Sequence, residues 1–262
     1  MLHDGLTMMR LTQPLMRWLG LLLAATLALQ VFFVLRIALM VVADPQSSTF
    51  QRSEAWRLQQ GRGGLRWRQQ WVPYGQIADS LKKAVIASED DGFVNHDGVD
   101  WDAVEKAWQK NARTEAEIAK AQANRKGAAV LAKGQPVRPP KVVGASTITQ
   151  QLAKNLFLSG ERTLLRKGQE FVLTLLLESL LSKQRILEIY LNNVEWGEGV
   201  FGAQAAAQHY FRKTASELSV LESARLAVML PRPRYFEKLP NSVYLAERAG
   251  VIAARLRAAE LP

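Results

Sequence analysis

The chain has 262 residues, of which 48% are hydrophobic and 22% charged, a composition typical of a globular protein and unlike that of a disordered one. It contains no cysteine, which excludes disulfides and thiolate metal sites. The formal net charge of +10 and the pI near 10 indicate an anionic partner, which could be a nucleic acid, an anionic lipid or a phosphate-bearing substrate.

The N-terminal segment carries the strongest physical signal. Residues 18–35 contain no charged side chain, and the apolar run resumes after Arg36. About 20 helical residues span the hydrocarbon core of a membrane. We therefore predict a transmembrane anchor over residues 18–43, preceded by a cytoplasmic N-terminus, residues 1–17.

A cleavable signal peptide is the alternative to this anchor. Residues 41–43, Val-Val-Ala, loosely resemble a cleavage site, but the apolar run is longer than the apolar region of a signal peptide. Arginines lie on both sides of the run, so the positive-inside rule favours a cytoplasmic N-terminus only weakly.

The segment after the anchor is polar at first and then acidic. Residues 44–65 suit a linker or a short helix, and residues 66–77 form an aromatic-rich entry to the next helix. That helix, predicted from Ile77 by the spacing of apolar residues, leads into the stretch 88–102, which holds six carboxylates.

The acidic stretch could be a calcium loop, a catalytic loop or a solvated turn. With Gly98 at the invariant glycine position, the first and twelfth positions would be Phe93 and Val104, where calcium loops require acids. A calcium loop is therefore excluded.

Residues 103–142 form a charged insertion. The segment contains nine Lys or Arg residues and three Glu residues, and it ends in a Pro-rich stretch. We predict a charged helix with an extended exit, which is either a solvated surface element or a membrane-surface contact.

The pattern from Ser146 to Asn192 is helical, with a break expected at Ser159-Gly160, and helices are also expected in the tail up to residue 259. Residues 197–202 match GxGxxG, but a helix precedes them in place of a strand, so we predict a glycine turn between helices. Alternation of apolar and polar residues never exceeds four residues, which predicts a mainly α fold.

Residues 146–155, STITQQLAKN, place small hydroxyl residues where a helix should begin, followed by two glutamines and a lysine. Donors near a helix start favour an anion there. A capped surface helix is the plainer interpretation.

Three cations follow, Arg162, Arg166 and Lys167, and then Glu170. Arg166 and Glu170 have the spacing of a surface salt bridge on a helix, and the cluster equally suits a phosphate clamp. Together with the acidic loop and the anchor, these residues suggest a sugar attached to a lipid phosphate. A carboxylate would act as general base on a sugar hydroxyl, and cations would stabilise a departing pyrophosphate.

Four motifs in this order resemble those of the peptidoglycan glycosyltransferases, glycosyltransferase family 51. They are Glu89-Asp90-x-x-Phe93-x-x-His96-x-Gly98, the run from Gly144 to Asn155, Arg166-Lys167-x-x-Glu170, and Lys183-x-x-Ile186-Leu187-Glu188-x-Tyr190-Leu191-Asn192. The stretch from Pro231 to Pro240 stands where a looser fifth motif would lie. Because no transpeptidase domain is present, the chain is most similar to the monofunctional members of the family.

The resemblance implies a lysozyme-like α-helical lobe, with a small membrane-contacting jaw, over residues 66–262. It implies polymerisation of lipid II into β-1,4-linked glycan, with inversion and release of undecaprenyl pyrophosphate. Glu89 would be the general base and Glu170 the second catalytic carboxylate. The expected substrate-binding residues are Asp90, Phe93, His96, Ser146, Thr147, Gln150, Gln151, Lys154, Asn155, Arg162, Arg166 and Lys167.

The same resemblance implies partners and a location. The partners would be lipid II, the growing glycan strand and membrane lipid, and the family also allows contacts with cell-wall synthesis or division proteins. No nucleic acid is expected. No metal site is predicted, although a divalent cation such as Mg²⁺ or Mn²⁺ stays an option. The protein would be a single-pass protein of the inner membrane with its catalytic domain in the periplasm.

Two departures from the family pattern stand out, and two other functions remain open. Ala145 replaces a common glycine, and the insertion 103–142 is longer and more charged than the corresponding stretch of the family. A lysozyme-like glycan-cleaving enzyme would also need one critical carboxylate. A non-catalytic anchor that binds lipid-linked precursors would be expected to lack Glu89 or Glu170, and both are present.

Overall fold

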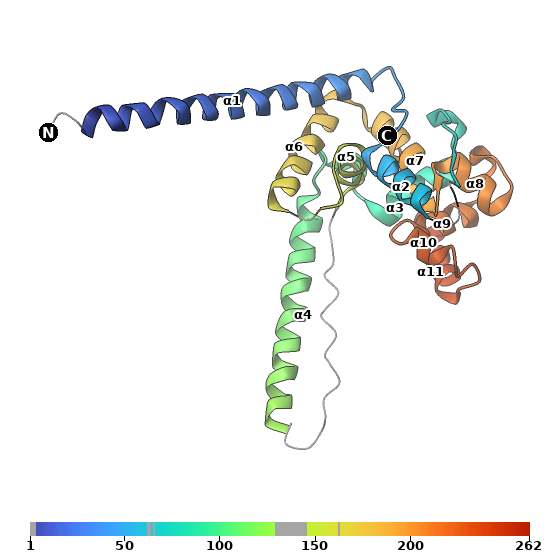
Figure 1. Cartoon of the computed structure of the whole chain (residues 1–262). Coiled ribbons are helices and arrows are strands. Elements are labelled where there is room, and N and C mark those ends of the chain that lie inside the picture. The colour runs from blue at the N-terminus through green and yellow to red at the C-terminus, as the bar shows by residue number, and fades with distance from the viewer. Residues whose placement is uncertain (1–3, 62–63, 65, 129–145, 162) are drawn as a thin grey trace.

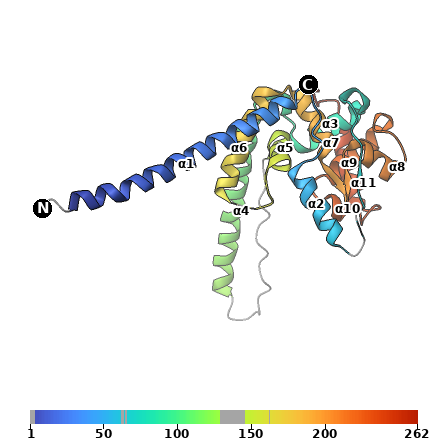
Figure 2. The same cartoon turned by 45° about the horizontal axis from the view of Figure 1, so that its top comes forward.

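The computed structural model describes residues 4–61, 64, 66–128, 146–161 and 163–262. A helical body carries two long helices, α1 and α4, which leave it as separate arms, and α6 lies where both arms meet the body (Figures 1 and 2). The predicted mainly α fold is confirmed.

The described helices are α1 (Asp4–Leu39), α2 (Thr49–Gln60), α3 (Asp79–Glu89), α4 (Trp101–Ala128), α5 (Ile148–Phe157), α6 (Leu164–Leu180), α7 (Lys183–Asn193), α8 (Ala203–Phe211), α9 (Val220–Met229), α10 (Pro233–Phe236) and α11 (Val243–Arg255). Short 3₁₀ turns cover Tyr74–Gln76, Phe93–Asn95 and Ala215–Glu217.

Hydroxyl caps explain where several helices begin. Ser48, Thr147, Thr163, Ser182 and Ser219 each accept a hydrogen bond from the backbone N–H three residues later, which satisfies one of the free donors of a helix start. The predicted break at residues 159–160 lies between α5 and α6. A second break, at the Ser182 cap, divides α6 from α7 and was not predicted.

The glycine turn predicted at residues 197–202 is wrong in one respect, because this segment belongs to a small sheet. Strands β2 (Glu195–Gly197) and β3 (Val200–Phe201) pair antiparallel, and β1 (Arg68–Gln69) pairs parallel with β3. Gly199 has a positive φ of 72°, and a Cβ there would lie 2.0 Å from the carbonyl oxygen of Arg66. Only glycine allows this close approach of the strands.

The core lies around α7, whose Ile186, Leu187, Ile189 and Leu191 are fully buried. The helix α9 packs against α3 and α11, and α5 packs against α2, α6 and α7. The ends of α3 and α5 therefore meet inside one rigid framework, which fixes the side chains that they carry.

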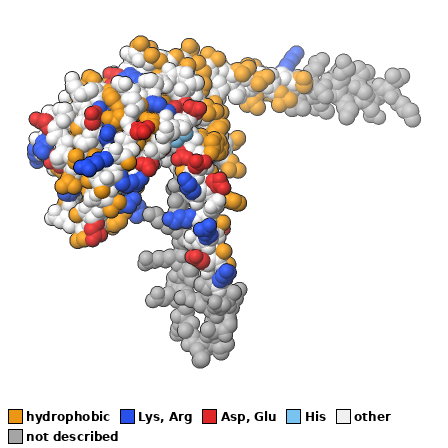
Figure 3. Space-filling view, turned by 180° about the vertical axis from the view of Figure 1, so that it is seen from behind, with side chains coloured by type: hydrophobic (Ala, Val, Ile, Leu, Met, Phe, Trp, Pro, Cys, Tyr) orange, Lys and Arg blue, Asp and Glu red, His pale blue; other side chains and the backbone are white. Residues whose placement is uncertain are grey.

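The helix α1 contains a segment, Met16–Leu39, that is long and apolar enough to cross a membrane. Figure 3 shows its hydrophobic side chains exposed along the arm. The end of the helix and the turn after it behave differently, because Phe33, Ile37 and Met40 are buried in the core of the body. The Arg185 side chain also donates to the carbonyl oxygen of Met40 at 2.8 Å.

The predicted linker, residues 44–65, contains α2, which packs against α5. The Thr49 hydroxyl donates to the carbonyl oxygen of Leu156 at 2.9 Å, and the Gln51 side chain to that of Asn193 at 3.2 Å. The described part of this segment is therefore built onto the body.

The charged insertion predicted at 103–142 begins as the helix α4, with mixed charges along its described surface (Figure 3). Its first turn contacts α6, where the rings of Trp101 and Phe171 lie 6.5 Å apart. The expected Pro-rich exit lies outside the described residues.

Candidate active site

The acidic loop is held by Asp90, whose side chain is buried at the end of α3. One carboxylate oxygen accepts a hydrogen bond from the Nε2 of His96 at 2.8 Å, and the other accepts one from the backbone N–H of Ile148 at 2.9 Å. The His96 Nδ1 accepts from the Gly98 N–H at 3.1 Å. The proton of the neutral imidazole is therefore on Nε2, where it is donated to Asp90.

The start of α5 is fixed to the same loop. Thr147 and Gln150 cap each other reciprocally, at 3.2 and 3.3 Å, and the Thr147 hydroxyl donates to the carbonyl oxygen of Gly98 at 2.7 Å. The sequence predicted an anion at this helix start. The anion found there is the carboxylate of Asp90.

Glu89 is the last residue of α3 and is only partly exposed. Its Oε2 accepts from the Gln151 side chain at 2.9 Å, and the Gln151 Oε1 accepts from the Tyr190 hydroxyl at 3.0 Å. Burial raises the pKa of Glu89, the hydrogen bond from Gln151 and the charge of Lys154 lower it, and Asp90 raises it, with a net rise.

Tyr190 completes this hydrogen-bond chain from inside the core. Its side chain is buried, and burial together with the nearby Glu89 and Asp90 raises the pKa of its hydroxyl well above the ordinary value. Tyr190 therefore stays protonated and donates to Gln151, which in turn donates to Glu89. The result is a carboxylate fixed in position that takes up a proton more readily than an ordinary glutamate.

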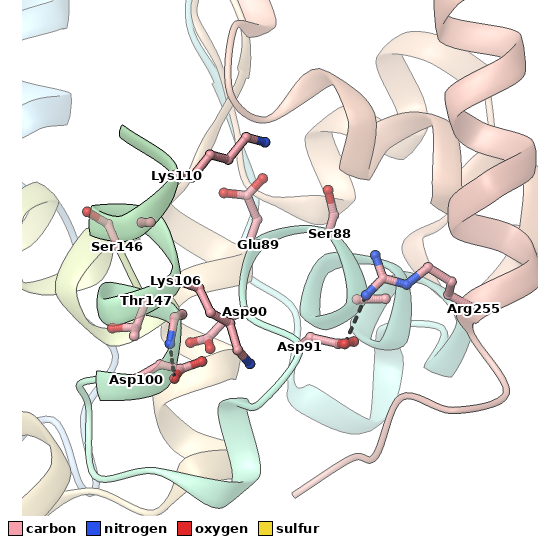
Figure 4. Close-up of a pocket in the computed structure, with 13 residues that line it drawn as sticks. Ser88, Glu89, Asp90, Asp91, Asp100, Lys106, Lys110, Ser146, Thr147 and Arg255 are labelled. Atoms are coloured by element: carbon pink, nitrogen blue, oxygen red, sulfur yellow. Dashed lines mark hydrogen bonds and ion pairs between the residues drawn. The ribbon is translucent and has the colours of Figure 1, made fainter. Parts of the chain in front are cut away.

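A cavity of about 380 Å³ opens beside Glu89 (Figure 4). The helices α3, α4 and α11 and the start of α5 contribute its lining, which includes Glu89, Asp90, Asp91, Asp100, Lys106, Lys110, Ser146, Thr147 and Arg255. The Arg255 guanidinium is paired with Asp91 at 2.9 Å.

Glu170 lies on α6 and is also buried. Its two oxygens accept from Arg166, at 2.9 Å, and from the ammonium of Lys167. The salt bridge predicted from spacing is formed, and its acid is inside the protein while Lys167 is half exposed. The Arg166 Nε is buried and has no hydrogen-bond partner among the described residues.

The structure assigns different surroundings to the predicted site residues. Glu89, Asp90, Ser146 and Thr147 line the cavity. Lys154 is exposed, Asn155 is partly buried, and Arg162 lies outside the described residues, as do Gly144 and Ala145 of the second motif.

Two predicted substrate-binding residues, Phe93 and Gln150, lie in the interior. Phe93 is fully buried beneath the ammonium of Lys183, which is 4.7 Å from the ring centroid. Its packing against the acidic loop shapes the site, and its ring is out of reach of a ligand in the cavity. Gln150 is buried as a helix cap.

Sequence reasoning missed Tyr190, Lys106, Lys110 and Arg255 as site residues. Tyr190 stands within the fourth motif, and Lys106 and Lys110 have the i,i+4 spacing that brings side chains to one helix face. Nothing in the local pattern of Arg255 connects it with the acidic loop.

No three His, Asp or Glu side chains gather in a metal-binding arrangement in the described part of the chain. The site as described consists of side chains and backbone groups alone.

The chain is similar to known proteins over most of its length. The family model described as Transglycosylase matches residues 59–122 and 124–257. A protein of Burkholderia pseudomallei (strain K96243) named Biosynthetic peptidoglycan transglycosylase is 52% identical over 250 residues, which are 94% of this chain and 88% of the relative. A protein of the same name from Paraburkholderia xenovorans (strain LB400) is 50% identical over 248 residues, or 94% of this chain and 93% of the relative.

Proposed function

We propose a function from the premise that this chain belongs to the transglycosylase family. In this proposal, the chain polymerises lipid II into β-1,4-linked glycan strands of peptidoglycan. The chain is a peptidoglycan glycosyltransferase. The proposal adds the lipid-linked substrate, inversion at the anomeric carbon and undecaprenyl pyrophosphate as the leaving group. The observation that carries it is Glu89, a half-buried carboxylate with a raised pKa beside a cavity and near cations.

In the proposed reaction, Glu89 takes the proton of the acceptor's 4-hydroxyl as that oxygen attacks the anomeric carbon of the donor. The new carbon–oxygen bond forms as the bond to the pyrophosphate breaks, and the pyrophosphate leaves with the electron pair. Because its pKa is raised, Glu89 holds the transferred proton better than an exposed glutamate would.

Cations on α5 and α6 stabilise the charge of the leaving group. Lys154 is close enough to Glu89 to influence its pKa, and Arg166 and Lys167 follow on α6. Arg162, outside the described residues, belongs to the same proposed set. Glu170 binds both Arg166 and Lys167, so its proposed role is to position these two cations toward the substrate.

The proposed location is the inner membrane, with one transmembrane segment and the catalytic domain in the periplasm. Support comes from the apolar segment Met16–Leu39. Further support comes from large apolar side chains on α4 and α6 that are exposed, among them Trp108 (72%), Leu164 (92%) and Leu165 (88%). A surface of this kind suits contact with membrane lipid, which also holds the lipid tail of the substrate.

Replacing the base tests the proposal. The Glu89→Gln protein should lose at least about 100-fold in the rate of glycan polymerisation, because general-base catalysis contributes about that much or more. The assay uses the purified full chain with lipid II and no partner protein, with glycan products separated by gel electrophoresis. Glu247→Gln, an exposed carboxylate on α11, is the matched control.

Near-normal polymerisation by the folded Glu89→Gln protein would contradict the role of Glu89. If the wild-type chain released soluble sugar fragments from finished cell wall and made no polymer, the cleaving alternative would replace the proposal. If it bound lipid II and made neither product, the non-catalytic anchor would.

A further inference from the structure

The helix α4 presents two chemically different faces near the body. Ala103, Lys106, Ala107 and Lys110 line the cavity beside Glu89. Trp101 lies away from this cavity lining and contacts Phe171 of α6. The first turns of the charged insertion are therefore one wall of the active-site cavity.

The two lysines, Lys106 and Lys110, bring positive charge to this wall of the cavity. The i,i+4 spacing puts both ammonium groups on the same helix face, where like charges weaken a helix. Figure 4 shows Lys110 extended above Glu89 and Lys106 near Asp90. Neither lysine forms an ion pair within the described part of the chain.

The acids that line the cavity already have other partners. Glu89 accepts from Gln151, and Asp91 is paired with Arg255. Asp90 has both oxygens occupied, and Asp100 caps α4 by accepting from the Ala103 N–H at 2.8 Å. None of these acids forms an ion pair with Lys106 or Lys110 among the described residues, so the two ammonium groups can pair with an anion that enters the cavity.

We propose that Lys106 and Lys110 bind the diphosphate of a lipid-linked sugar substrate, as a cation pair separate from the set of cations proposed for α5 and α6. This inference rests on the proposed function. A glycosyl transfer between two lipid-linked sugars brings two diphosphates to one active site, and each needs its own countercharge. The diphosphate bound by α4 belongs either to the donor or to the acceptor, and both have the same chemistry.

Direct binding tests the pair without catalysis. The full chain carrying Glu89→Gln is titrated with vesicles that contain undecaprenyl diphosphate, and with vesicles that contain the neutral alcohol undecaprenol. Adding Lys106→Gln and Lys110→Gln together should weaken binding of the diphosphate about tenfold, as for the loss of charge-assisted hydrogen bonds, and leave binding of undecaprenol unchanged. The binding measurement gives a result even if the protein does not polymerise lipid II, so it can be distinguished from failure of the proposed function.

Kinetics of the otherwise wild-type chain form the second arm. Lys106→Gln with Lys110→Gln should raise KM about tenfold with a smaller change in kcat. Lys106→Arg with Lys110→Arg should restore KM, because it keeps both charges. Lys120→Gln, an exposed lysine on the same helix outside the cavity lining, is the matched control.

A substrate whose 4-hydroxyl is blocked can act only as donor. Its use distinguishes binding of the donor's diphosphate from binding of the acceptor's diphosphate. A raised KM when this blocked substrate is varied assigns the lysines to the donor, and a raised KM when the acceptor is varied assigns them to the acceptor. The inference is overturned if the folded double Gln protein keeps wild-type affinity for the diphosphate vesicles, or if the Arg protein is as impaired as the Gln protein.

Discussion

At the scale of single residues, the site depends on a balance of influences on Glu89. Burial raises the pKa of this carboxyl, and the position at the C-terminal end of α3 acts in the same direction because the negative end of the helix dipole disfavours a second negative charge. The hydrogen bond from Gln151 opposes both. Gln151 is oriented by Tyr190, so a residue buried in the core helps to determine the protonation of Glu89, the proposed base.

The pH dependence of the reaction follows from this balance. A general base works in its ionised form, so activity should rise with pH through the raised pKa of Glu89, above the usual glutamate range. Tyr190→Phe removes the donor that orients Gln151 and should move this acid limb to higher pH. It should also cost about 1 kcal/mol of stability, as expected for one buried hydrogen bond.

The measurements are kcat/KM as a function of pH and thermal unfolding of the full chain. Tyr244→Phe, in which the hydroxyl removed is on an exposed residue of α11, serves as the control and should change neither quantity. An acid limb that stays in place in a folded Tyr190→Phe protein would contradict the role given to this hydrogen-bond chain.

At the scale of elements, the period of apolar residues predicted the longer helices. Patterns of neighbouring residues did not predict the strands or the contacts between residues far apart in the sequence. Strands β1 and β3 have two residues each, too few for a period to appear. The pairing of Asp90 with the N–H of Ile148 joins positions 58 residues apart. Motif resemblance identified Glu89 and Gln151, whereas the contribution of α4 to the cavity required the structure.

The helices α1 and α6 meet through a reciprocal amide pair. The Gln30 side chain donates to the Gln169 side chain at 3.1 Å and accepts from it at 3.3 Å. Gln30 lies within the apolar segment Met16–Leu39, where a polar side chain needs a partner. The pair joins α1 to the residue next to Glu170.

Gln30→Leu should destabilise the full chain by about 1 kcal/mol, since Gln169 would lose its partner in apolar surroundings. Adding Gln169→Leu should recover part of that loss, because neither amide is then left unpaired. Thermal unfolding in lipid or detergent measures both effects. Thr26→Val is the control, because the Thr26 hydroxyl bonds only to its own helix, at Leu22. Equal stability of wild type and Gln30→Leu would show that the pair contributes nothing.

At the scale of the whole molecule, the end of α1 and the body share one core. Phe33, Ile37 and Met40 belong to α1 and the turn after it, yet they are buried among residues of the body. A signal peptide cut after Ala43 would take these three side chains away. Retention of this segment, which the length of the apolar run predicts, would keep the three side chains in the core.

Removal of residues 1–43 should therefore cost about 5 kcal/mol or more, because burying each of the three side chains contributes ~1.5–3 kcal/mol. Removal of residues 1–15 leaves all three in place and should leave stability unchanged. Thermal unfolding of the two shortened proteins measures the loss of stability. The mass of the mature natural protein shows whether residues 1–43 are retained. A stable, fully active chain without residues 1–43 would contradict the shared core.

The ion pairs of Glu170 also bear on which ligands the enzyme can select. The carboxylate of Glu170 pairs with both Arg166 and Lys167 and offsets one of their two positive charges, so an arriving anion must compete with this built-in counterion. A singly charged group gains little from such an exchange, whereas the denser charge of a diphosphate gains more. In the proposed reaction, this competition favours a diphosphate over the singly charged anions of the surroundings.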